Sequence, residues 1–252
     1  MKGPIRKRWV VGGLGVAVLL AVGGTMLFLF RDRATPVARE EVTTLVPGGG
    51  RPGDAGLYLY TTRGFETTDA LMGARHDYPA QTYLTIQPGG CGTLVRWQAL
   101  RERWTEHDYC PDGSLAGSQH FRRWFGVGNL DRWVCSPPIS TRGEPGESWE
   151  GVCTREAGSN VAAAERVLRH EAVGYETLEV GGEQVETLHL RSRSIGTGAS
   201  LSEDTTETWI LPGTLLIVRQ TSSISSTTQS RIGSVHYYEE YEITLVSLQP
   251  SS

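Results

Sequence analysis

Residues 91–110 read CGTLVRWQALRERWTEHDYC, two runs rich in β-branched and aromatic residues around a four-residue loop. Such runs favour strands, and a loop of four residues can close an antiparallel hairpin through a type I turn without glycine. Pairing Gln98 with Arg103 places Trp97 opposite Trp104. The stretch therefore predicts a β-hairpin with both tryptophans on one face.

The chain has four cysteines, and the hairpin pairs two of them. Its register places Cys91 opposite Cys110, which predicts a disulfide there and leaves Cys135 with Cys153 by elimination. No Cys-x-x-Cys is present and the histidines lack zinc-finger spacing, so we expect neither a metal nor a cofactor. Two disulfides indicate an exported domain. The alternative is four free structural thiols in a cytoplasmic one.

Residues 9–30, WVVGGLGVAVLLAVGGTMLFLF, carry no charge and are long enough to cross a hydrocarbon core as a helix. The basic residues of 1–8 favour a cytoplasmic N-terminal tail and an extracytoplasmic remainder. A cleaved signal peptide is the competing interpretation. The run exceeds the usual apolar region of about 7–15 residues and no small-x-small site follows it, which favours an uncleaved anchor. Residues 31–56, rich in glycine and proline towards their end, are expected to be a tether.

Residues 57–252 show the residue pattern of one β domain, with short β-rich runs separated by glycine and proline turns. We predict an all-β fold, an antiparallel sheet or half-barrel, with a helix starting near 161–166 as the one exception. The expected strands are 57–62, 81–87, 93–98, 103–109, 117–124, 132–135, 149–154, 166–173, 177–180, 184–193, 205–211, 215–222 and 235–248.

Two short sequence motifs recur in the same order along the chain. GFET at 64–67 returns as GYET at 174–177, and the segment 105–115 is echoed by 206–215. This order favours a duplicated β unit. The alternative is that β proteins reuse turn words such as Pro-Gly-Thr. The predicted units are 55–135 and 164–248.

The second half resembles a known kind of exported domain. GYET at 174–177, VGGEQVET at 180–187 and ETWILPGTL at 207–215 are similar to uncharacterised exported β-rich domains of actinobacteria. Those domains are similar in shape to the half-barrels of lipoprotein carriers of the LolA type. The resemblance implies a cleft that holds a lipid, and it carries over no functional residue.

Charge and composition exclude several classes of function. Residues 34–252 hold 18 arginines and 27 acidic residues, a net charge near −9, which argues against nucleic acid as a partner. No lysine follows Lys7, so the domain has no amine for Schiff-base chemistry. A nucleophile elbow, a phosphate loop and a dinucleotide-binding motif are absent from the sequence.

The polar residues suggest no catalytic site from their spacing. His76-Asp77 and His107-Asp108 are adjacent pairs, and neighbouring residues of a strand point to opposite faces, so surface or loop histidines are expected. In the last strand, Tyr237, Tyr241 and Ile243 are expected to share one face. We predict a solvated face for the carboxylates there.

The sequence thus predicts a membrane-anchored binding or interaction module of the cell envelope rather than an enzyme. Its expected partners are the membrane, through the helix at 9–30, and an apolar ligand or an envelope protein. Alternatives are an envelope hydrolase with a His and carboxylate site formed by the fold, or a purely structural assembly partner. The candidate ligand-face aromatics are Trp97, Trp104, Trp209, Tyr237 and Tyr241.

Overall fold

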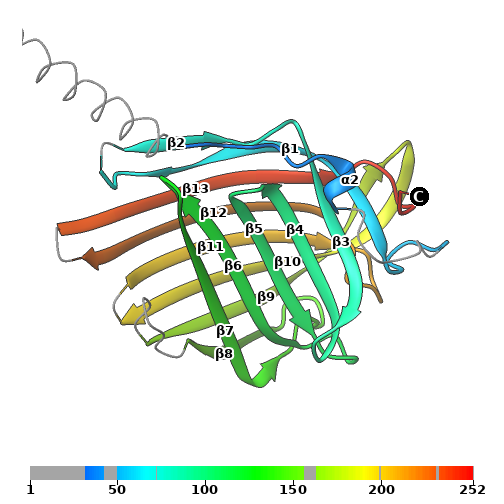
Figure 1. Cartoon of the computed structure of the whole chain (residues 1–252). Coiled ribbons are helices and arrows are strands. Elements are labelled where there is room, and N and C mark those ends of the chain that lie inside the picture. The colour runs from blue at the N-terminus through cyan, green and yellow to red at the C-terminus, as the bar shows by residue number, and fades with distance from the viewer. Residues whose placement is uncertain are drawn as a thin grey trace, which may run out of the picture.

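The computed structural model describes residues 32–42, 50–71, 73–155, 163–198, 200–230 and 233–251. One short helix precedes thirteen strands (Figure 1). The elements are α2 (Arg39–Val42), β1 (Gly56–Thr68), β2 (Ala74–Asp77), β3 (Gln81–Gly89), β4 (Gly92–Leu100), β5 (Arg103–Tyr109), β6 (Leu115–Trp124), β7 (Val127–Ile139), β8 (Ser148–Arg155), β9 (Ala164–Val180), β10 (Glu183–Gly198), β11 (Ser200–Ile210), β12 (Ile217–Ser230) and β13 (Gly233–Leu245).

The sheet is antiparallel throughout and closes on itself. Strands β3 to β13 follow one another around it, and β1 lies between β3 and β13, with Tyr60 opposite Leu245 and Thr68 opposite Tyr237. Strand β2 pairs only with the second half of β1. Twelve strands thus form a barrel and β2 is an extra strand (Figure 1). The all-β antiparallel prediction is confirmed. The half-barrel is wrong, because pairing first and last strands leaves neither of them as an open edge.

The hairpin at 91–110 forms, but one residue out of the predicted register. Gln98 lies opposite Trp104 and Trp97 opposite Thr105, and an irregularity after Gln98 shortens the loop to two residues. A slip of one residue moves a side chain to the other face of a sheet. Trp97 is accordingly buried in the core, whereas Trp104 lies on the outer wall beside Phe121.

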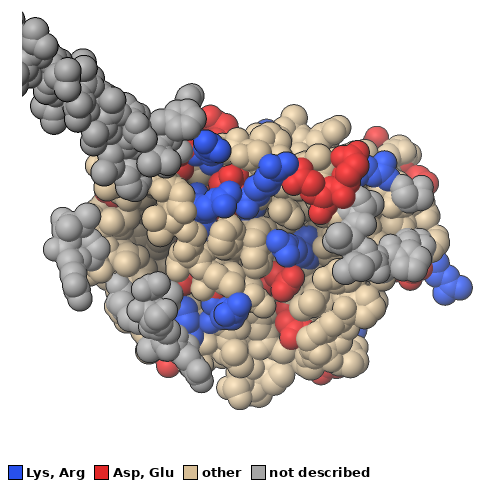
Figure 2. Space-filling view, in the orientation of Figure 1, with Lys and Arg blue, Asp and Glu red and all other residues tan. Residues whose placement is uncertain are grey.

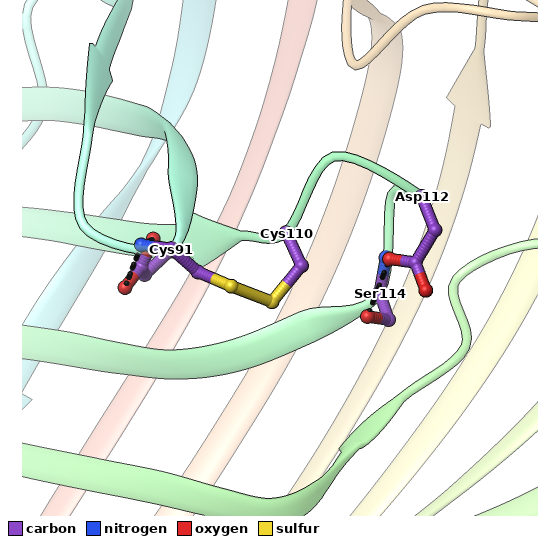
Figure 3. The surroundings of a disulfide bond; sticks show 5 residues. Cys91, Cys110, Asp112 and Ser114 are labelled. Carbon is purple, nitrogen blue, oxygen red and sulfur yellow. Dashed lines mark hydrogen bonds between the residues drawn. A yellow bond between two sulfur atoms is a disulfide. The ribbon is translucent and has the colours of Figure 1, made fainter.

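Both predicted disulfides are present. Cys91 and Cys110 connect the β3–β4 turn to the end of β5, with a Cα–Cα distance of 4.7 Å (Figure 3). Cys135 and Cys153 lie directly opposite each other on β7 and β8, 4.0 Å apart at Cα. The first bridge survives the register error because both of its cysteines lie just outside the paired strands.

The main core fills the part of the barrel interior that β1, β3, β4, β12 and β13 enclose. Inward-facing side chains of these strands pack together, and the tip of the β9–β10 hairpin adds Leu178 and Val185. The helix expected near 161–166 is wrong for Ala164 to Arg166, which begin β9. The buried members of the core are Tyr58, Tyr60, Tyr78, Leu84, Ile86, Val95, Trp97, Ala99, Leu100, Val180, Leu216, Val218, Tyr241, Ile243 and Leu245.

The segment 32–42 is bound to the barrel. Asp32 accepts a hydrogen bond of 2.9 Å from the backbone N–H of Phe125, and Thr35 donates one of 2.9 Å from its backbone to Glu102. The segment then runs from beside β2 to α2 (Figure 1). The first part of the expected tether, 31–56, is therefore docked. The predicted transmembrane helix at 9–30 lies outside the described residues, and within them no helix is long and apolar enough to span a membrane.

Candidate functional site

A cavity of about 200 Å³ lies inside the barrel, between the inward faces of β5, β6 and β9 to β12. The interior of a barrel widens with the number of strands, so twelve strands leave space that side chains do not fill. Much of the cavity lining is apolar. The apolar lining residues are Leu115, Trp133, Leu168, Leu190, Ile210, Ile217 and Tyr241.

The charged side chains of Arg166 and Asp204 also line the cavity. Arg166 of β9 lies over the ring of Trp133 at 4.4 Å, and its Nη2 is 3.7 Å from Oδ2 of Asp204 on β11. Burial raises the pKa of Asp204, against the lowering effect of Arg166. The two groups form a loose buried ion pair beside the cavity.

Five buried donor or acceptor atoms at the cavity lack a partner among the described residues. They are Arg166 Nε, His170 Nε2, Trp133 Nε1, Ser194 Oγ and Asp204 Oδ1. Buried polar atoms of native proteins are nearly always hydrogen-bonded to protein, to water or to a ligand. The cavity is thus prepared to hydrogen-bond whatever fills it.

Three histidines, His107, His120 and His170, also line the cavity. The surface or loop position predicted for His107 is therefore wrong. Nε2 of His120 is 3.1 Å from Ser118 Oγ, and Nδ1 of His170 is 2.7 Å from Ser192 Oγ. Burial lowers the pKa of His107 and of His170 to about 4, and it lowers that of His120 well below its ordinary value. All three imidazoles are neutral at pH 7 and act there as hydrogen-bonding groups.

A second polar cluster, centred on Glu239 of β13, occupies the interior near β1 and β2. Most of its polar atoms are hydrogen-bonded within the cluster, and Arg122 Nε is an exception. Arg103 donates two bonds of 3.0 Å to Glu239, which also accepts from Tyr78 at 2.6 Å and from Tyr237 at 2.7 Å. Burial acts to raise the pKa of Glu239, but Arg103 and then Arg122 outweigh it and lower that pKa.

The Glu239 cluster extends to the docked segment. The hydroxyl oxygen of Tyr237 is also 2.8 Å from Glu66, so its single proton is shared between Glu66 and Glu239. Nδ1 of His76 is 2.9 Å from Glu66, and Nε2 of His76 is 2.8 Å from Asp32. The solvated face predicted for the last strand is therefore wrong for Glu239, which shares the inward face with Tyr237 and Tyr241. Because most of its polar atoms are hydrogen-bonded within it, this cluster has a structural role.

Of the five predicted ligand-face aromatics, Trp97, Tyr237 and Tyr241 lie inside the barrel and the other two lie outside. Tyr241 lines the cavity and stacks on Trp97 at 4.4 Å, while Tyr237 belongs to the Glu239 cluster. Trp104 and Trp209 lie on the outer wall. The residues that dominate the cavity, such as Arg166, were missed, because the strands that carry them alternate little between polar and apolar.

Trp209 belongs to a compact outer cluster. It stacks on His189 at 4.3 Å and donates a hydrogen bond of 2.9 Å to Glu176. His189 in turn contacts Glu176 at 2.8 Å and Glu207. The ring of Trp209 is thus covered and offers no open surface to a ligand.

Comparisons with known proteins assign no function to the chain, so its function is inferred from the geometry of the cavity. No protein-family model matches the chain, and no curated protein does. Among solved structures, the chain is similar to the hypothetical lipoprotein YmcC from Escherichia coli. The two share 9% identity over 86% of this chain and 100% of that one, with a TM-score of 0.36.

Proposed function

We propose that this chain is an envelope-associated binding module that holds one small ligand inside its barrel. The observation that carries the proposal is the cavity of about 200 Å³, whose lining combines unpartnered polar atoms with apolar side chains. Two disulfides and the apolar run at 9–30 support an extracytoplasmic, membrane-anchored location.

The lining favours an amphiphilic ligand rather than the purely apolar one that the sequence suggested. An apolar body suits Leu168, Leu190 and Ile210, and an acceptor or anionic end suits Arg166 and Nε2 of His170. The cavity is smaller than typical pockets for drug-sized molecules, which measure about 300–1,000 Å³. The ligand is therefore a short chain or a single ring.

Octanoate and octanol test this chemistry, because they share a chain and differ in charge. Binding at about a hundred times the dissociation constant stabilises by about 2.7 kcal/mol, which raises the Tm of a domain of this size by about 5 °C or more. We expect octanoate to raise the Tm more than octanol. The replacement Arg166→Gln should remove that difference, whereas Arg169→Gln, on the outer side of the same strand, should keep it.

Filling the cavity provides the second test. Thr208→Phe adds a ring to the lining of β11, and Thr205→Phe adds the same ring to the exposed side of that strand. We expect only the first to abolish binding of octanoate and recovery of any co-purified small molecule by organic extraction and mass spectrometry. If neither probe binds the parent protein and nothing is extracted, the binding proposal fails and an assembly role becomes the better account.

The hydrolase alternative has one observation in its favour, the Ser118–His120 and Ser192–His170 pairs. A general base is most effective when its pKa lies near the working pH, and a pKa of about 4 for His170 makes it a weak base at pH 7. Cleavage of p-nitrophenyl butyrate that disappears in Ser192→Ala or Ser118→Ala would favour the hydrolase.

A further inference from the structure

One end of the barrel, which we call the N-terminal rim, carries the β1–β2, β4–β5, β6–β7 and β10–β11 connections. In an antiparallel meander alternate connections lie at the same end, and the docked segment at 32–35 contacts this end through Phe125 and Glu102. The chain therefore reaches the barrel at the N-terminal rim.

Three large apolar side chains are exposed on the N-terminal rim. Leu71 is 67% exposed, Val127 71% and Leu201 62%. They belong to the β1–β2, β6–β7 and β10–β11 connections or the first residue or two beyond them, so they are spread around the circumference rather than gathered in one groove. Three apolar side chains spaced around the rim can contact a flat surface at the same time, with the barrel axis roughly perpendicular to it.

The rim turns use apolar residues where glycine would be less strained. Leu71 has φ 57° and Phe125 has φ 51°, and they are the non-glycine residues with positive φ in the described chain. Bulky residues are rare in that region of backbone space. Both turns thus have an apolar side chain at a backbone position that is strained for any residue other than glycine.

The short link between the apolar run at 9–30 and the docked residue Asp32 determines which end of the barrel faces the membrane. Asp32 is held by Phe125 and His76, and a single residue separates it from Phe30, the last residue of the apolar run. Two Cα–Cα steps span at most about 7 Å. That distance is comparable to the headgroup layer, which adds about 5–8 Å on each side of the hydrocarbon core.

We propose that the barrel stands on the membrane surface on its N-terminal rim, with Leu71, Val127 and Leu201 in the lipid headgroup layer. The inference uses the predicted anchor and does not depend on the lumen ligand. The contact is made by apolar side chains, and three rim arginines are paired: Arg75 with Asp77 at 2.7 Å, Arg101 with Glu41 at 2.6 Å and Arg123 with Glu102 at 2.9 Å. Arg33 of the docked segment is exposed and adds a charge at this end. Figure 2 shows acidic and basic side chains intermixed on the wall of the barrel that faces the viewer.

Fluorescence quenching in the full chain tests this orientation. The chain is inserted into phosphatidylcholine nanodiscs containing lipids with a nitroxide near the headgroup, and bimane is attached at Val127→Cys or Leu201→Cys. The native cysteines are all bridged, so they do not compete for the label. Val134→Cys is the matched control, since it is the same residue type on the same strand and 61% exposed. Seven residues of strand separate it from Val127 by about 23 Å.

We expect bimane to lose most of its emission at 127 and at 201 and to keep it at 134, in low and in high salt alike. Quenching at 134 as strong as at 127 would mean that the barrel lies on its side. Quenching at neither rim position, or at only one, would overturn the upright contact. Loss of the rim quenching in high salt would overturn its apolar nature, and failure of the chain to enter nanodiscs would remove the anchor on which it rests.

Discussion

Individual buried charges decide much of the stability of this barrel. Arg103 and Glu239 are paired inside it, and their neighbours complete the hydrogen bonding. Removing one partner of a buried ion pair leaves the other charge unpaired, which typically costs about 3–5 kcal/mol. Exposed ion pairs contribute little.

The replacement Glu239→Gln should therefore lower the free energy of unfolding by about 3 kcal/mol. Glu203→Gln breaks the exposed pair with Arg193 and should leave that free energy nearly unchanged. Urea unfolding followed by circular dichroism measures both. Equal losses in the two variants would show that the Glu239 cluster does not stabilise the fold.

The cavity histidines make stability depend on pH. Burial lowers the folded pKa of His107 and of His170 to about 4, against an ordinary value near 6.5, and it also lowers that of His120 well below the ordinary value. Between pH 6.5 and 4 the unfolded chain binds protons that the folded chain does not, so the free energy of unfolding falls as pH falls. A difference of 2.5 pKa units corresponds to about 3 kcal/mol per histidine.

His76 acts in the opposite direction. Burial acts to lower its pKa, but Glu66 and then Asp32 outweigh it and raise that pKa. Its contribution is present below the ordinary value and is lost as pH rises through the raised one. With three cavity histidines against one, acid should destabilise the barrel.

We expect thermal unfolding to show a falling Tm from pH 6.5 to pH 4. The double variant His107→Asn/His170→Asn should have a flatter profile, and His236→Asn, at an exposed site, should follow the parent. A parent profile that is flat in this range would mean that the cavity histidines are protonated in the folded barrel.

At the scale of elements, two strands have a glycine with positive φ in their interior rather than at an end. Gly64 in β1 has φ 145° and Gly174 in β9 has φ 154°. They are the glycines of the repeated words GFET and GYET. A Cβ added to Gly64 would collide with the carbonyl oxygen of Glu240 on β13, whereas one added to Gly174 meets nothing within 4 Å.

Both Gly→Ala variants should be destabilised by backbone strain of about 1–3 kcal/mol. Gly64→Ala should lose more, because the β1–β13 pairing must also shift. Chemical denaturation of the pair tests this, and an equal loss would show that the contact with Glu240 relaxes without cost.

The two echoes do not point to one simple duplication. Counting barrel strands, GFET in β1 and GYET in β9 are seven strands apart, whereas the turns at 110–114 and 211–215 are six apart. Both turns do end in similar geometry, with positive φ at Gly113 and Gly213. Local turn chemistry explains the second echo without an ancestral repeat.

At the scale of the whole molecule, the seam between β1 and β13 joins the two ends of the domain. Ile243 of β13 is 1% exposed and packs in the main core. Truncating a buried isoleucine to alanine costs about 2–5 kcal/mol. Because the seam closes the barrel, this loss of free energy should destabilise all the strands together.

We therefore expect Ile243→Ala to shift the unfolding curves from circular dichroism and from tryptophan fluorescence together, as one transition. Val134→Ala, at an exposed position, is the control and should shift neither. Two separate transitions would mean that the halves of the barrel unfold independently.

Local patterns in the sequence determined the β class, the antiparallel order and both disulfides. These features depend on short-range chemistry, namely turn residues, β-rich runs and the even number of cysteines. The shared inward face of Tyr237, Tyr241 and Ile243 also followed from simple alternation.

Only the tertiary structure decided closure, register and the cavity. Pairing of β1 with β13 joins residues nearly the whole domain apart, and no local signal encodes it. The bulge after Gln98 moved Trp104 outward, since a single extra residue reverses the side-chain alternation. The polar lining of β11, with Asp204 and Thr206 inward and Glu203 and Glu207 outward, offers no hydrophobic contrast between faces. Which face is the interior was settled by the closed barrel itself.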